Sequence, residues 1–218
     1  MYIYENPSLN SWTTGERRFD GWHSWDGYEL GQPATNQISF IEAEVTTTQE
    51  KDGRPSISFR RRGAMDPRKV EQFIKRFCDP ILKYEVGRKL LAAVRTGRHP
   101  VEIAWDNGKF GFNGTIATDR AGALNGRRGS AAVIFIDQKA PDLAKFPIIQ
   151  ANPDVGLFHE LLHAWHTQNG TVVDDQREME RRIVGMGDFI NAKGTENDYR
   201  AARNLDRRCC WEKEKLSN

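Results

Sequence analysis

The stretch LFHELLHAWH at residues 157–166 carries the pattern H-E-x-x-H, with its two histidines at His159 and His163. A proline-punctuated loop precedes this stretch and Gly170 follows it, so we predict one helix over about 154–168. The apolar side chains of the same stretch predict a buried face on the opposite side of the helix: Leu157, Phe158, Leu161, Leu162 and Trp165. We therefore expect the histidines to point away from that face, toward a cleft.

The spacing of the two histidines suits a metal ion. On a helix, His159 and His163 differ by about 40° and stand about 6 Å apart along the axis, so both rings can reach one Zn²⁺ with bonds of about 2.0–2.1 Å. Glu160 lies beside that ion, where a carboxylate acts as the base toward water that the ion activates. A chance match of three residues is the alternative, but the helical context favours a zinc site.

A catalytic zinc site needs a third protein ligand and an open fourth position. His166 lies about 10 Å along a continuous helix from His159, so we predict that it belongs to the second shell or the rim of the site. The third ligand is then expected among the acidic residues that follow. These are Asp174, Asp175, Glu178, Glu180, Asp188 and Glu196.

Three motifs follow one another in the second half of the chain: HELLHA at 159–164, EMERRIVG at 178–185 and TENDYR at 195–200. Their order resembles the NleD-type zinc metallopeptidases, which bacteria deliver into host cells by type III secretion. It is also similar, more distantly, to the clostridial neurotoxin light chains. The resemblance covers about residues 130–208, whereas residues 1–130 resemble no family.

The resemblance implies a particular third ligand. In both families this ligand is a glutamate five residues before a glycine, which corresponds to Glu180 before Gly185. The family carries a further glutamate where this chain has Met179, and this departure leaves Glu178 as a rival ligand. The ordinary alternative for both glutamates is a solvated helix face beside neighbouring arginines.

The third motif supplies further candidates for the reaction. Glu196, Asn197 and Arg200 match the family's pattern. Arg200 either stabilises the oxyanion of a tetrahedral intermediate or joins helices through an ion pair with Glu178 or Glu196. Tyr199 is a second candidate oxyanion donor, with a buried structural aromatic as the alternative.

The rest of the chain predicts an α+β fold, because strands come mostly first and helices last. We expect a tryptophan-rich arm over residues 1–40 and one domain over 41–218, to which the resemblance assigns a zincin-like metallopeptidase fold with a small mixed sheet. The run 131–136 suits either a core strand or the edge strand that binds extended substrate in zincins. The expected elements are a hairpin over 38–48 and 56–59, one kinked or two helices over 67–95, a second hairpin over 101–105 and 109–112, a loop over 113–130, and helices over 175–184 and from Thr195.

Composition excludes several classes of protein. The 218 residues carry a net charge of only +2, which argues against a nucleic-acid binder. Basic pairs such as Arg127-Arg128 and Arg207-Arg208 are therefore predicted to be solvated surface, although Arg127-Arg128 can also meet an acidic substrate. No apolar stretch approaches ~18 residues, so we expect no membrane span. The three cysteines predict free thiols in a reducing compartment.

These observations predict a zinc-dependent endopeptidase that acts as a monomer on a protein substrate. The resemblance implies a bacterial effector, secreted without a Sec signal and acting on an intracellular protein in the host cytoplasm, with a secretion chaperone as a further partner. Two alternatives stay open. One is a metallopeptidase toxin of another secretion system. The other is an inactive zinc-containing binding module, against which the intact Glu160 argues.

Overall fold

The computed structural model describes residues 38–49 and 55–209. Five strands form one curled sheet in the order β2-β1-β3-β5-β4. Strands β1, β3 and β5 are parallel, and β2 and β4 run antiparallel to their neighbours at the two edges, so the predicted mixed sheet is confirmed. The strands are β1 (Ile38–Gln49), β2 (Pro55–Ala64), β3 (Val101–Asp106), β4 (Gly114–Ala117) and β5 (Ala132–Asp137).

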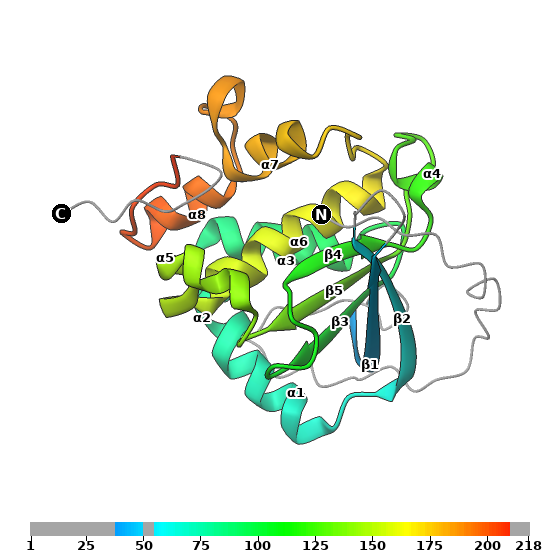
Figure 1. The fold of residues 1–218 in the computed structure, drawn as a ribbon. Helices are drawn as coiled ribbons and strands as arrows, with labels where there is room; N and C mark the ends of the chain where they lie inside the picture. Colours follow the sequence, from blue (N-terminus) through cyan, green and yellow to red (C-terminus); the bar gives the residue numbers. More distant parts are fainter. Residues whose placement is uncertain (1–37, 50–54, 210–218) are drawn as a thin grey trace.

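The main helices cover one face of this sheet (Figure 1). Side chains alternate along each strand, so Ile103 packs against the helices while Ala104 belongs to a separate aromatic cluster on the other face. This two-layer arrangement confirms the α+β class. The helices are α1 (Pro67–Phe73), the π-helical η4 (Ile74–Cys78), α2 (Asp79–Leu82), α3 (Glu85–Arg95), α4 (Arg120–Ala123), η5 (Pro141–Lys145), α5 (Pro147–Ala151), α6 (Pro153–Asn169), α7 (Gln176–Val184), η6 (Gly187–Phe189) and α8 (Glu196–Ala202).

The first predicted hairpin is confirmed, because β1 and β2 pair antiparallel. The second is wrong, since residues 109–112 form no strand and β3 pairs with β1 and β5 instead. The buried carboxylate of Asp137 accepts hydrogen bonds from the backbone N–H groups of Gly108, Phe110 and Gly111 at 2.7, 3.0 and 2.8 Å. These bonds wrap the segment around the end of β5 instead of pairing it with β3.

The apolar run in β5 is covered on both faces, as expected of a core strand. The alternative role as a substrate-binding edge strand is wrong, because β5 pairs with β3 on one side and β4 on the other. Strand β4 forms the edge of the sheet beside α6. It lies within the segment predicted to be a loop, where its four residues, GTIA, are too few to show a periodic pattern.

The helix boundaries follow the local signals. Gly170 and Gly185 end α6 and α7 with φ values of 67° and 80°, a conformation that glycine adopts without strain. Thr195 and Asp198 form a capping box at the start of α8. In the first helical segment the helix does not break at Pro80 but ends after α2. The proline ring would clash with the preceding turn of a regular α-helix, and the wider π-helical turn of η4 leaves room for it.

Several predictions concern residues outside the described ranges. Most of the tryptophan-rich arm belongs there, as do the turn of the first hairpin and Cys210, whereas residues 38–40 begin β1. Cys78 is buried, Cys209 is exposed, and both are free thiols. Within the described residues, no helix combines the length and the apolar character needed to cross a bilayer.

Candidate metal centre

Helix α6 places the H-E-x-x-H residues at the wall of a cavity. The helix packs against β4 and β5 and also contacts α7 and α8. His159, Glu160 and His163 are each less than 10% exposed, and all three line a cavity of about 200 Å³. The predicted polar face therefore exists, in a helix whose remaining faces are enclosed by the core.

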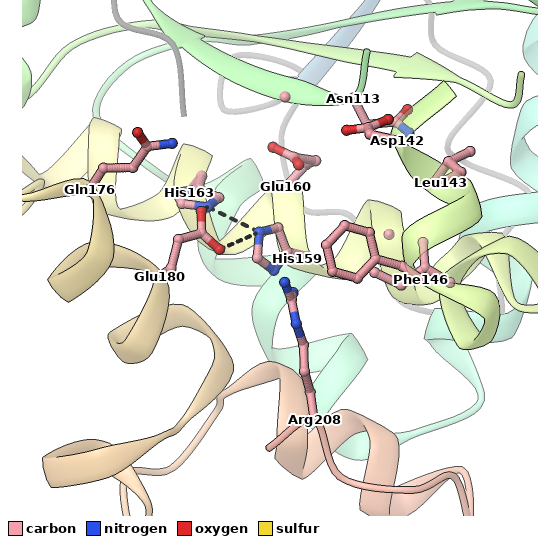
Figure 2. A pocket seen from close by; sticks show the side chains of 13 residues that line it. Asn113, Asp142, Leu143, Phe146, His159, Glu160, His163, Gln176, Glu180 and Arg208 are labelled. Atoms are coloured by element: carbon pink, nitrogen blue, oxygen red, sulfur yellow. Dashed lines mark hydrogen bonds and ion pairs between the residues drawn. The ribbon is translucent and has the colours of Figure 1, made fainter. Parts of the chain in front are cut away.

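Three side chains converge on one point in this cavity (Figure 2). The Nε2 atom of His163 lies 3.1 Å from Nε2 of His159 and 3.0 Å from Oε1 of Glu180. The Nε2 atom of His159 lies 3.3 Å from Oε2 of the same glutamate. Tetrahedral ligands with bonds of about 2.0–2.1 Å stand about 3.3 Å apart. The buried group His159, His163 and Glu180 can therefore hold a metal ion.

Helix α7 carries both rival glutamates but directs their side chains differently. Glu180 faces the histidines and is buried, while the side chain of Glu178 is 47% exposed and pairs with Arg182 one turn later. His166 also lies outside the group, and its Nδ1 atom stands 2.7 Å from the hydroxyl of Thr171. The structure thus brings together the ligand set that the motif resemblance implies.

The group is electrostatically coupled. Burial alone lowers the pKa of His159, but Glu180 and Glu196 outweigh it and raise that pKa to about 10. Burial opposes ionisation of Glu180, yet the two histidines hold the pKa of its carboxyl well below the usual range. The two glutamates thus make positive charge favourable at this point of the cavity.

A buried carboxylate orients His159 from behind. Glu196 accepts a hydrogen bond from Nδ1 of His159 at 2.7 Å and another from Nε of Arg200 at 2.6 Å. Despite burial, these contacts and the charge of Arg208 hold the pKa of Glu196 near 2. Such outer partners fix the ring and its tautomer at metal sites.

Arg200 is fully buried and is absent from the residues that line the cavity. Of its two predicted roles, the structure favours the ion pair with Glu196 over oxyanion stabilisation. Tyr199 is likewise buried, stacks on Phe158 with ring centroids 4.3 Å apart, and donates its hydroxyl to Asp154 at 2.6 Å. Its expected role as oxyanion donor is corrected to that of a structural aromatic, because its hydroxyl is held away from the cavity.

The cavity contains an arginine that sequence reasoning placed on the solvated surface. Arg208 is 7% exposed and lines the cavity, with its guanidinium 4.6 Å from the ring centroid of Phe146. Asn197 holds it there, since its side chain donates to the carbonyl of Arg208 at 3.0 Å and accepts from its N–H at 2.7 Å. Nothing in the sequence distinguishes this arginine from the other basic pairs.

The sequence does not predict two further residues near Glu160, Thr115 and Asp142. Thr115 on β4 directs its hydroxyl to the Glu160 carboxylate at 2.8 Å and to the Glu160 carbonyl at 3.0 Å. Asp142 on η5 lines the cavity. Arg128, by contrast, pairs with Asp119 outside the cavity, as does Arg120 with Asp174.

Comparison of this chain with protein-family models, with curated proteins and with solved structures finds no match.

Proposed function

We propose that the protein is a zinc-dependent endopeptidase with a zincin-like active site. The observation that carries the proposal is the buried group of His159, His163 and Glu180 beside the carboxylate of Glu160 in one cavity. Two imidazoles and a carboxylate, with an open side toward the cavity, are a ligand set typical of catalytic zinc. When bound, zinc supplies a Lewis acid that polarises a carbonyl and lowers the pKa of water toward ~7.

In this proposal Glu160 is the general base and later the acid that protonates the leaving amine. It lines the cavity next to the ligand group and is not one of the three ligands. Thr115 holds its Oε2 atom from the adjacent strand. That contact leaves the other carboxylate oxygen to exchange the proton.

Arg208 takes the role first considered for Arg200. Among the described residues that line the cavity, it is the one that carries a guanidinium. A fixed cation stabilises the negative charge that develops on the carbonyl oxygen of the scissile bond. Glu196 and Arg200 then act as positioning residues behind His159.

A peptide substrate is favoured by the sheet beside the helix. Strand β4 pairs with β5 and with no other described strand, and its first residue, Gly114, lines the cavity. The rest of β4 is buried, so an extended peptide in the cavity would meet the strand at Gly114 and could form main-chain hydrogen bonds there. The scissile bond would then lie over α6.

The cellular setting rests on the motif resemblance alone. We propose a secreted bacterial effector that acts on an intracellular protein in the host cytoplasm. A toxin of another secretion system would use the same site, and an immunity gene beside its gene would identify that case.

The test is proteomic cleavage profiling with the wild type and the Glu160→Gln variant. Glu178→Gln is the matched control, because it removes a carboxylate that lies outside the ligand group. We expect new peptide termini with the wild type and the control, and none with Glu160→Gln at unchanged zinc content. Equal activity of Glu160→Gln and wild type in cells would show that the protein works by binding.

A further inference from the structure

The cavity continues past Glu160 on the side away from the ligand group (Figure 2). This part is built by η5, α5 and the residue that connects them. Leu143, Phe146 and Ile149 supply apolar walls, and the carboxylate of Asp142 lies opposite Glu160. A substrate residue next to the scissile bond would place its side chain here, because Glu160 must adjoin that bond.

Asp142 differs from the other buried or half-buried aspartates nearby. The carboxylate of Asp137 accepts backbone N–H groups, and that of Asp154 accepts from Tyr199 and Arg203. The Oδ1 atom of Asp142 is buried and has no hydrogen-bond partner among the described residues. A buried acceptor without a partner costs free energy, which a ligand's donor recovers.

The space in front of Asp142 is bounded by two carboxylates, its own and that of Glu160. Burial raises the pKa of its carboxyl, backbone N–H groups of η5 and Lys145 oppose that rise, and the nearby Glu160 adds to it. Lys145 is exposed, and Arg208 stacks on the ring of Phe146. Two carboxylates thus face one space whose apolar walls suit the aliphatic stem of a long basic side chain.

We infer that Asp142 is a specificity-determining residue that binds a lysine or arginine side chain of the substrate residue adjoining the scissile bond. The inference rests on the proposed peptidase function. The stem packs on Leu143 and Ile149, and the ammonium or guanidinium group donates to Oδ1 of Asp142. Electrostatic complementarity of this kind supplies specificity between otherwise similar ligands.

The experiment compares peptide libraries cleaved by the wild type, Asp142→Asn and the control Glu178→Gln. We expect the wild type and the control to favour lysine or arginine over norleucine at one position adjoining the cut by about 10-fold or more in kcat/KM. Asp142→Asn should lose this preference while still cleaving norleucine peptides. A wild-type preference for tyrosine or another neutral residue, or an unchanged preference in Asp142→Asn, would overturn the inference.

A binding measurement keeps the inference separate from the proposed function. The hydroxamates of arginine and norleucine share a metal-binding head and differ in the charge of the side chain. Zinc-loaded wild type should bind the arginine compound about 10-fold more tightly, and Asp142→Asn should bind both equally. Equal affinities in the wild type refute the subsite, whereas a clear difference without any peptide cleavage refutes the peptidase and retains the subsite.

Discussion

Replacing Thr115 with valine tests how the edge strand controls the candidate base. The Thr115 hydroxyl is fully buried and lies 2.8 Å from Oε2 of Glu160 and 3.0 Å from its carbonyl oxygen. Valine keeps the shape of the side chain and removes the hydroxyl. The carboxylate of Glu160 then loses the contact that orients it from β4.

The expected loss follows from the strength of that contact. A hydrogen bond to a charged group contributes about 1.5–3 kcal/mol, which corresponds to about 10- to 150-fold in rate if the oriented carboxylate is needed in the transition state. We therefore expect kcat of Thr115→Val to fall by about 10- to 100-fold. KM and zinc content should change little, because Thr115 is neither a ligand nor part of the cavity wall.

Steady-state kinetics, zinc analysis and thermal unfolding measure these effects together. Thr115 is fully buried, so loss of its hydroxyl should also lower the free energy of unfolding by about 1–2 kcal/mol, or roughly 2–8 °C in Tm. Thr115→Ser is the matched control, since it restores the hydroxyl and should return most of kcat. A folded Thr115→Val variant with wild-type kcat would refute the reasoning, and a serine variant as slow as valine would assign the effect to packing.

The remaining predictions concern the ligands and Arg208. Purified protein should carry about one zinc ion per chain, and elemental analysis should find none after combined His159→Ala and His163→Ala substitution; metal retained by that double variant would contradict the site. Glu180→Ala should lose zinc in dialysis while Glu178→Ala keeps it, and the reverse order would exchange their roles. Because the pKa of His159 is about 10 in the metal-free protein, zinc uptake at pH 7 should release its proton, which calorimetry in buffers of different ionisation enthalpy detects. After treatment with a chelator, the same raised pKa adds to the free energy of unfolding below about pH 6.5, and this contribution is lost as pH rises toward 10. An unfolding free energy that stays constant across that pH range would contradict the prediction. Arg208→Ala should lower kcat by about 10²- to 10³-fold with zinc retained, and Arg208→Lys should recover part of it; a change confined to KM would indicate a substrate-binding role only.

Local signals in the sequence were sufficient for the helix that carries the site. The i, i+4 spacing of His159 and His163 and the glycines after α6 and α7 act through neighbouring residues, so their consequences do not depend on distant parts of the chain. These local signals do not identify Glu180 as a ligand, and its assignment came from the motif resemblance. The structure then grouped it with the histidines across the gap between two helices.

The environment of the site was decided by tertiary structure. Arg200 and Arg208 look alike in the sequence, yet one is buried behind Glu196 and the other reaches the cavity because Asn197 holds its backbone. The sequence predicts a loop where β4 lies, because four residues show too little pattern and the pairing of β4 with β5 is a long-range contact.

Local patterns in the sequence predicted the α+β class, the helix that carries the H-E-x-x-H motif and its two histidines, because caps and helical periodicity are properties of adjacent residues. Only the folded chain decided that Thr115 contacts Glu160 and that Asp142 lines the same cavity. Those positions depend on burial and hydrogen bonding between segments far apart in the chain. Such contacts leave no periodic trace in the order of the residues.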